Sequence, residues 1–304
     1  MKDGKKLSEL VKPYRVDDGA KFKLKDHDPG DTGGLPAEYK TKAAELLKKS
    51  IEELAELQQK LYAQDRWALL LIFQAMDAAG KDSTIKHVMS GVNPQGVQVY
   101  SFKAPSAEEL DHDYMWRAVS RVPERGRIGI FNRSHYEECL VVRVHPEILG
   151  KQRIPQRLVT GNIWRERFED ISAMERYLAR NGTVILKFFL NVSRKEQRER
   201  FLERLEEPAK NWKFSLADIS ERALWAKYQA AYQDMIRHTS APQAPWHVVP
   251  ADHKWFARVV IGSTIVSALD RLDLHFPKVD KADRSEFKQV REALLAEEKG
   301  GAKK

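Results

Sequence analysis

The sequence contains one cysteine and no long uncharged apolar run. Among 304 residues, Cys139 alone cannot build an internal disulfide framework, and its apolar surroundings suit a small core residue. No apolar run reaches the about 20 residues that cross a membrane. The first ten residues, MKDGKKLSEL, lack the apolar segment of a signal peptide. We therefore expect a globular cytoplasmic protein without a membrane partner.

Two common catalytic patterns are also missing. The nine histidines show no metal-ligand spacing such as HExxH, and no Ser–His–Asp order stands out. A structural zinc site and a hydrolytic triad are therefore set aside. The chain also shows no RNA-binding signature and no aromatic β-platform, which argues against nucleic acid as its partner.

The net charge points to an anionic partner. Lysine and arginine exceed the acidic residues, which gives a formal charge of +8 and an isoelectric point near 9.3. A positive field attracts nucleic acid, nucleotides, phosphate polymers or acidic membranes, and charge alone does not choose among them. Part of the excess lies near the two ends, where it also serves solubility.

The stretch LLLIFQAMDAAGKDSTIK, residues 69–86, organises the rest of the chain. An apolar strand, a turn with a Gly-Lys pair and a helix-compatible segment follow one another. In this geometry, backbone N–H groups and a helix N-terminus can converge on phosphate. The match to a Walker-type loop is imperfect: Ala75 stands where Gly is expected, and Asp82 follows Lys81 where Ser or Thr is expected. An ordinary strand-to-helix turn with a surface lysine remains an alternative.

Strands and helices alternate along the chain, which predicts an α/β protein with a mostly parallel, five-stranded sheet. The expected strands are residues 67–73, 97–102, 127–133, 183–192 and 246–251, and the expected helices are residues 36–64, 106–122, 164–181, 193–207, 216–238 and 254–273.

The composition also suggests how the chain is divided. Residues 1–35 are polar and read as an N-terminal arm, and residues 36–276, which hold all the expected strands and helices, are the expected main domain. Within it, the charged helix and basic loop of residues 193–215 resemble a lid over an anionic substrate, although a solvated helix with ion pairs has the same pattern. Residues 277–304 form a tail or an oligomer contact.

Ligands of parallel sheets bind beyond the carboxyl ends of the strands, and polar residues follow two such ends here. If the turn binds phosphate, Asp77 or Asp82 is placed to hold Mg²⁺, and Asn132 and Arg133 project from a neighbouring strand. The cations that would close over the substrate are Arg200, Arg204, Lys210 and Lys213.

Each of these residues has a simpler interpretation. Asp77 could cap the turn, Arg133 could form a surface ion pair, and Glu137 with Glu138 could lie on a solvated helix face. The functional interpretation gains weight because acid, lysine and arginine recur at strand ends of one predicted sheet.

Four segments resemble the family-2 polyphosphate kinases. They are FQAMDAAGKDSTIKHVMSGVNPQG (73–96), IGIFNRSHYEECLVVRVHPE (128–147), EEPAKNWKFS (206–215) and APWHVVPADHKWFAR (244–258). The resemblance covers roughly residues 40–275 in the right order. It implies a three-layer α/β/α, P-loop kinase-like fold with a helical lid, and Mg²⁺-dependent phosphoryl transfer between inorganic polyphosphate and nucleotides. Mn²⁺ could replace Mg²⁺.

The resemblance also accounts for the irregular loop, because the family's version reads Asp-Ala-Ala-Gly-Lys, as residues 77–81 do. Many members have Asp-Arg-Ser after the third strand, whereas this chain has Asn132-Arg133-Ser134 followed by Glu137. That variant resembles class III, which accepts both AMP and ADP, and Glu137 could replace the charge missing at position 132. The resemblance implies a polyphosphate kinase that converts AMP to ADP and ADP to ATP, reversibly.

The implied roles fall into three sets. Asp77, Lys81 and Arg133 are catalytic, with Asp77 as the metal ligand. Asn132, Arg133 and Glu137 bind the nucleotide. Phosphate and polyphosphate contacts come from Ala78, Ala79, Gly80, Lys81, Asp82, Ser83, Lys86, Arg200, Arg204, Lys210 and Lys213.

Two other functions remain open from the sequence alone. An ATP-dependent nucleoside monophosphate kinase uses the same fold and loop, and the isoelectric point with Trp212 among cations suggests a nucleic-acid-binding protein. We also expect a homo-oligomer, a dimer or a tetramer.

Overall fold

The computed structural model describes residues 9–301, which contain a six-stranded sheet with the strand order β1-β6-β5-β2-β4-β3. Strands β2 to β6 are parallel, and the short β1 runs antiparallel to β6. The strands are β1 (Arg15–Val16), β2 (Ala68–Ala75), β3 (Val97–Ser101), β4 (Ile128–Asn132), β5 (Thr183–Asn191) and β6 (Trp246–Pro250). The mostly parallel α/β class is confirmed, and the expected number of five strands is wrong by one.

Strand β2 lies at the centre of the sheet. Its residues are apolar apart from Gln74, which suits a position that is covered on both faces. It pairs with β4 on one side and with β5 on the other, and all eight of its residues are buried. After β2, the chain forms β3 and β4 on one side of β2 and then β5 and β6 on the other side. Such a reversal opens a crevice at the carboxyl ends of the strands, and β2 ends there at the Gly-Lys turn.

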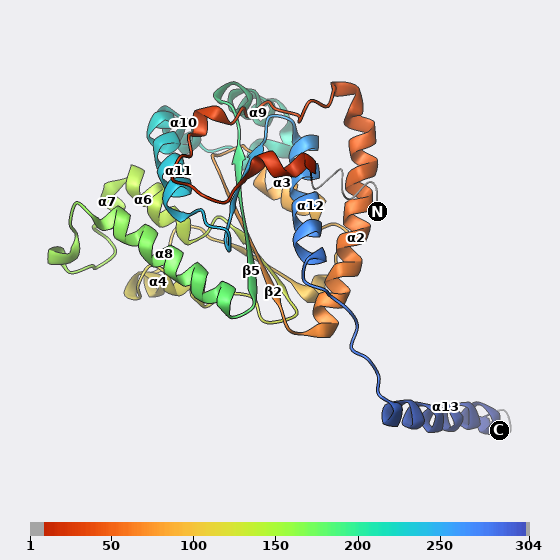
Figure 1. The fold of residues 1–304 in the computed structure, drawn as a ribbon. Helices are drawn as coiled ribbons and strands as arrows, with labels where there is room; N and C mark the ends of the chain where they lie inside the picture. The colour runs from red at the N-terminus through yellow and green to blue at the C-terminus, as the bar shows by residue number, and fades with distance from the viewer. Residues whose placement is uncertain (1–8, 302–304) are drawn as a thin grey trace. The chain divides into compact units, whose positions relative to one another are not determined.

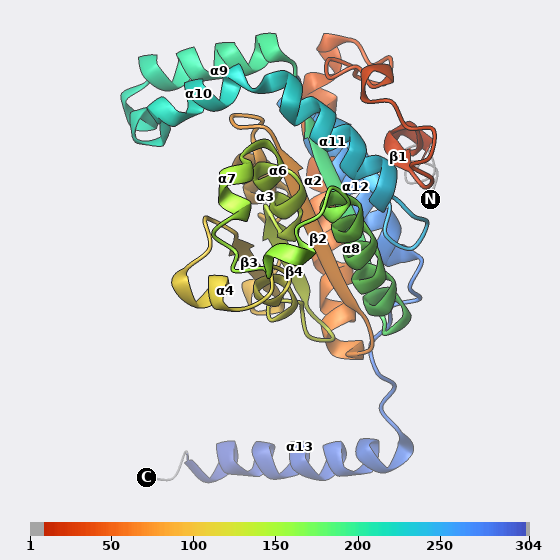
Figure 2. The same ribbon diagram turned by 90° about the vertical axis from the view of Figure 1, so that its left-hand side faces the viewer.

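Helices cover both faces of the sheet (Figure 1). α2 (Lys40–Gln64) and α12 (Lys254–Asp270) pack on one face, and α8 (Ile163–Arg180) and α11 (Trp225–Thr239) pack on the other. The expected lid segment, residues 193–215, contains α9 (Arg194–Glu206) and η7 (Pro208–Lys213). α10 (Leu216–Ala223) follows it and runs beside α9 (Figure 2), so the three elements together are called the lid below. Shorter helices are α3 (Lys81–Val88), α4 (Ala107–Asp111), α5 (Trp116–Val119), α6 (Val141–Val144) and α7 (Pro146–Leu149). Short 3₁₀ turns are η1 (Lys12–Tyr14), η2 (Leu24–Asp26), η3 (Ala37–Tyr39), η4 (Pro94–Gly96), η5 (His135–Cys139) and η6 (Gln156–Leu158).

The N-terminal segment differs from the expected arm. Residues 9–35 contribute strand β1 and several buried side chains to the core, among them Tyr14, Val16 and Phe22. Phe22 also offers its carbonyl to the guanidinium of Arg237, at 2.7 Å. The sequence hides this role because single apolar residues alternate irregularly with lysines and aspartates. Residues 1–8 lie outside the described part of the chain.

The helix expected over residues 106–122 is also different, because it is divided into α4 and α5. The capping box at its start is present, with Ser106 and Glu109 each accepting from the other's backbone N–H. The carboxylate of Asp113 accepts from the N–H of Met115 and thereby stabilises a turn that interrupts the helix.

The chain divides into two units after Leu274. The second unit, His275–Lys304, contains helix α13 (Lys281–Gly301), with Phe287, Val290 and Leu294 exposed. Among the described residues, no helix is both long and apolar enough to cross a membrane.

A buried ion pair supports the segment that follows β4. Lys187 in the middle of β5 is fully buried, and its ammonium donates to Glu175 at 2.6 Å, to the carbonyl of Thr239 at 2.7 Å and to the hydroxyl of Tyr136 at 2.9 Å. Tyr136 donates in turn to Glu175. All three ammonium protons are therefore used, as a buried charge requires. The network fixes η5 beside the carboxyl end of β4.

We predict that Lys187→Met lowers the free energy of unfolding by about 3–5 kcal/mol, because it leaves the Glu175 carboxylate buried without its cation. The double variant Lys187→Met/Glu175→Leu removes both charges and should recover most of this loss. Equilibrium unfolding in urea measures both. Equal stability of the single and double variants would show that the pair does not act as a unit.

Candidate active site

The phosphate-loop candidate, residues 76–83, follows β2 directly and passes into α3. Ala78 and Gly80 adopt left-handed backbone conformations, with φ of 58° and 100°. Gly80 needs its lack of a Cβ there, and it stands immediately before the first residue of α3. The N–H groups of residues 80 to 83 donate to no other group in the described part of the chain. Four consecutive donors at a helix start form a cradle for an anion.

Lys81 lies inside this cradle. Its ammonium donates to the carbonyl of Ala75 at 3.0 Å, at the end of β2. Burial lowers the pKa of Lys81, and the positive charge of Arg133 lowers it further, whereas Asp77 and Glu137 oppose the shift. The lysine is therefore held at the loop by one carbonyl, with its other two protons available to a ligand.

Arg133 lies between two carboxylates. Its guanidinium is 3.0 Å from Asp77 Oδ1 and 3.3 Å from Glu137 Oε2, and these neighbours, Glu137 first, raise its pKa. Its own φ is 62°, a strained value for a residue other than glycine. The N–H of Arg133 donates to Phe73 of β2, which stabilises this conformation. Arg133 therefore joins the end of β4 to the phosphate loop.

The buried amide of Gln74 supports Glu137 from β2. It lies 2.7 Å from Glu137 Oε1 and 3.0 Å from the hydroxyl of Ser134. Glu137 is thus held by an amide on one oxygen and by Arg133 on the other. Gln74 is absent from the predicted site residues, although a polar residue in an otherwise apolar strand indicates such a role.

Asn132 and Asp82 are partners across the crevice. The side-chain amide of Asn132 donates to Asp82 Oδ1 at 2.8 Å, which joins the last residue of β4 to the first turn of α3. Two of the positions that depart from the expected patterns, Asp82 and Asn132, therefore contact each other. The carboxylate missing at position 132 is present at position 82, on the opposite side of the same contact.

These groups border a cavity of about 670 Å³. Its walls carry acidic and basic side chains from several elements. The cations that line it outside the loop are Lys103, Arg133, Arg200, Arg204, Lys210 and Lys254. Asp218 of α10 also lines the cavity and pairs with Arg204 at 3.6 Å, and burial, then the charge of Asp77, raises its pKa.

The structure brings most of the expected residues to this cavity. The cavity is lined by residues 77–83, Asn132, Arg133, Arg204 and Lys210. Glu137 is not among the lining residues but contacts Arg133, which is. Lys210 is paired with Glu203 and Glu207. Lys86 is exposed and does not line the cavity. The side chain of Lys213 lies outside the described part of the structure.

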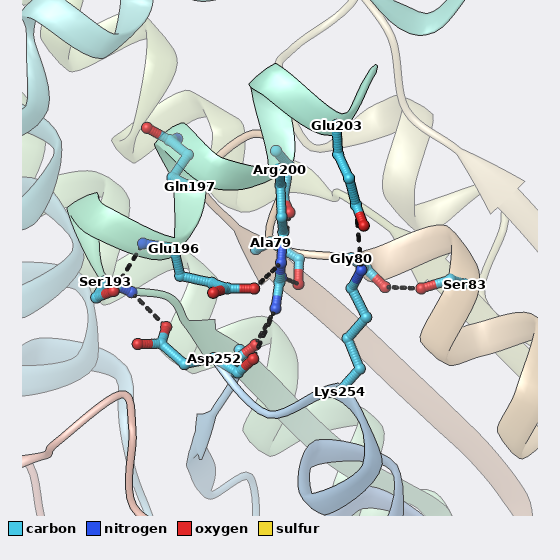
Figure 3. Close-up of polar contacts among 12 residues, drawn as sticks. Ala79, Gly80, Ser83, Ser193, Glu196, Gln197, Arg200, Glu203, Asp252 and Lys254 are labelled. Atoms are coloured by element: carbon cyan, nitrogen blue, oxygen red, sulfur yellow. Dashed lines mark hydrogen bonds and ion pairs between the residues drawn. The ribbon is translucent and has the colours of Figure 1, made fainter. Parts of the chain in front are cut away.

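Arg200 differs from the expected free cation of the lid. Its side chain is 5% exposed, and its guanidinium donates to four backbone carbonyls and to Glu196 (Figure 3). A guanidinium has five N–H bonds, so this one has none left for a polymer. Arg200 therefore contacts the loop itself.

Lys103, Lys254 and Asp218 are site residues that the sequence analysis missed. Lys103 follows β3 and Lys254 begins α12, after β6. The rule that ligands bind beyond the carboxyl ends of parallel strands could have identified both lysines. Asp218 had no signal of this kind, because it belongs to the lid.

The oxygen donors suit a hard divalent cation. Asp77 and Asp82 border the same cavity, and the described residues contain no group of three or more His, Cys, Asp or Glu that could form a complete metal cage. Mg²⁺ is typically bound by one or two carboxylates together with phosphate oxygens and water. The residues present fit that kind of site.

A parallel sheet with a phosphate loop after its central strand, a cation-lined cavity and a helical lid define a P-loop kinase-like phosphotransferase. Residues 37–277 match the family Polyphosphate kinase 2 (PPK2). The chain belongs to the polyphosphate kinase 2 family.

Individual relatives agree with this. The chain is 48% identical to an ADP-polyphosphate phosphotransferase of Rhodopseudomonas palustris, over 94% of this chain and 98% of the relative. It is 44% identical to an AMP/ADP-polyphosphate phosphotransferase of Meiothermus ruber, over 90% and 97%. Its fold is similar to the crystal structure of Polyphosphate Kinase 2 from Arthrobacter aurescens TC1, with a TM-score of 0.85, 40% identity and coverage of 93% and 96%.

We predict that Asn132→Asp lowers the Tm by about 2–4 °C in metal-free buffer at pH 7.5, because a second carboxylate would face Asp82 across the 2.8 Å contact. The double variant Asp82→Asn/Asn132→Asp restores one amide and one carboxylate and should recover the Tm. Thermal unfolding followed by circular dichroism measures both. Identical Tm values for the two variants would contradict a direct contact between these positions.

Proposed function

We propose that the chain transfers the terminal phosphoryl group of inorganic polyphosphate to AMP, giving ADP, and to ADP, giving ATP, and that it also catalyses the reverse reactions. The observation that carries this proposal is the set of N–H groups at residues 80–83, which have no acceptor among the described residues and lie at a cavity lined by cations that follow β3 and β4 or belong to the lid and to α12. Such a surface suits a substrate with many phosphates better than one with a single phosphate.

We assign different parts of the cavity lining to the two substrates. Arg204, Lys210 and Lys254, from the lid and from α12, line the cavity and would contact the polyphosphate chain. Asn132 and Glu137, after β4, would shape the region that receives the nucleotide. Arg133 and the loop also line the cavity and would contact the phosphates that react.

In the transfer, a terminal phosphate oxygen of the nucleotide attacks the last phosphorus of the polymer. The bond from that phosphorus to the bridging oxygen breaks, and the shortened polymer leaves with this oxygen. Lys81 and the loop N–H groups neutralise charge on the oxygens of the transferred group, and Arg133 orients the acceptor phosphate. Asp77 keeps Arg133 in position through their 3.0 Å contact.

Asp77, with Asp82 beside it, would hold Mg²⁺ or Mn²⁺. The metal ion would supply positive charge that stabilises the phosphate oxygens during transfer. The two carboxylates otherwise bind Arg133 and Asn132, so both are oriented before any ligand arrives.

Use of both AMP and ADP is supported by the pair of Asn132 and Glu137. The relative from Meiothermus ruber, named for both acceptors, is 44% identical to this chain. A shorter acceptor reaches less far toward the polymer. Glu137, fixed by Gln74 and Arg133, would limit where the nucleotide can lie and so help to place AMP. The cytoplasmic location and the homo-oligomer remain predictions from the sequence.

We predict that the purified protein with Mg²⁺ forms ADP from AMP and ATP from ADP when polyphosphate is the sole donor, and forms little ADP from AMP when ATP is the donor. Lys81→Ala should lower turnover at least 100-fold, because the transferred group loses its buried cation. The matched control is Lys49→Ala, at an exposed position of α2 far along the chain from the loop.

Nucleotide products separated by chromatography, with AMP and ADP tested side by side, measure these activities. Circular dichroism checks that Lys81→Ala is folded. The proposal is contradicted if polyphosphate gives no product, and the loop assignment is contradicted if Lys81→Ala retains near-normal turnover.

A further inference from the structure

Side chains of α9 bind three successive carbonyls of the phosphate loop. Gln197 donates to the carbonyl of Asp77 at 2.9 Å. Arg200, one turn later on the same face of α9, donates to the carbonyls of Ala78 at 3.2 Å and Ala79 at 2.7 Å. Both side chains are buried. The loop is therefore held by α9 through its backbone carbonyls.

The other donors of Arg200 fix its own position. They bind the carbonyls of Ala251 at 2.6 Å and Asp252 at 3.1 Å, in the turn after β6, and Glu196 at 2.8 Å (Figure 3). The carboxylate of Asp252 accepts from the N–H of Ser193, at the start of α9. The loop, the turn after β6 and α9 are thus joined through one guanidinium.

The direction of these contacts has a consequence for the loop. A trans peptide is planar, and its C=O and N–H point in opposite directions. The carbonyl of Ala79 belongs to the same peptide as the N–H of Gly80. Because Arg200 binds that carbonyl, the N–H of Gly80 is directed away from α9, on the side where the loop lines the cavity.

We propose that Arg200, together with Gln197, is a positioning residue of the reaction: it holds the carbonyls of residues 77–79 and so fixes the course of the loop up to the N–H of Gly80, the first of the four N–H groups of the phosphate cradle. The expected loss of kcat rests on the proposed function, whereas the expected effect on the conformation of the loop does not. It replaces the expected role of Arg200 as a direct contact of the polymer, and its charge adds to the positive field behind the loop.

Gln197 also connects the loop to α10, the second α-helix of the lid. The guanidinium of Arg222 in α10 donates to the side-chain oxygen of Gln197 at 2.7 Å, while the amide of Gln197 binds the loop. A movement of α10 would therefore be transmitted through Gln197 to the carbonyl of Asp77. The position of the lid and the form of the loop are linked by these two hydrogen bonds.

A positioning role and a direct polymer contact make different predictions for Arg200→Lys. Lysine keeps the charge, but one ammonium cannot bind four carbonyls and a carboxylate in a planar fork. A positioning role predicts that Arg200→Lys fails nearly as badly as Arg200→Gln, with the loss mainly in kcat. A direct contact predicts that Arg200→Lys retains kcat and mainly raises the KM for polyphosphate.

The experiment measures hydrogen–deuterium exchange of residues 76–86 in substrate-free protein, and kcat and KM with polyphosphate and ADP. We expect at least tenfold faster exchange and at least 100-fold lower kcat in both Arg200 variants. Arg198→Gln, exposed on the same helix, is the matched control and should behave as wild type. Gln197→Met removes one carbonyl contact and should give about a tenfold loss, and it serves as the test if the Arg200 variants do not fold.

Unchanged exchange in residues 76–86 with kcat within threefold of wild type would overturn the proposal, as would recovery of kcat in Arg200→Lys. The exchange measurement needs no substrate. If wild type proves inactive with polyphosphate, the proposed function fails, whereas faster exchange in the variants still supports the positioning role of Arg200.

Discussion

The hydrogen bonds from α9 to the carbonyls of residues 77–79 are the constraint on which the site depends. The left-handed backbone of Ala78 is costly for a residue other than glycine and needs support from its surroundings. Gln197 and Arg200 provide that support from buried positions. The apolar strand β2 fixes where the loop begins, and α3 fixes where it ends. The orientation of the N–H groups in the loop is therefore set from both ends.

Balanced charge organises the rest of the cavity. Arg133 is held between Asp77 and Glu137, Arg204 is paired with Asp218, and Asn132 binds Asp82. These contacts keep long side chains ordered before a substrate binds, which lowers the entropy cost of binding. Phosphates would then meet cations and N–H groups that already have their working geometry.

The sequence predicted the parts of the site that depend on local pattern. The apolar run of β2, the Gly-Lys turn and the N-cap Ser193 follow from spacing alone, and the structure contains them. The role of Arg200 could not be predicted, because its carbonyl partners are distant in the chain: Ala251 is 51 residues away and Ala79 is 121 residues away. Burial separates Arg200 from Arg204, although both occupy the same charged helix. The pairing of Asp82 with Asn132 likewise appears only when β4 lies beside β2.

The central claim is that phosphate groups bind to the loop N–H groups that α9 holds in place. Titration of ¹⁵N-labelled protein with inorganic tripolyphosphate and Mg²⁺, followed by two-dimensional NMR, tests it most directly. The amide signals of residues 80–83, which have no acceptor in the described part of the chain, should show the largest shifts. Binding with those four signals unchanged and the largest shifts outside the cavity would contradict the account.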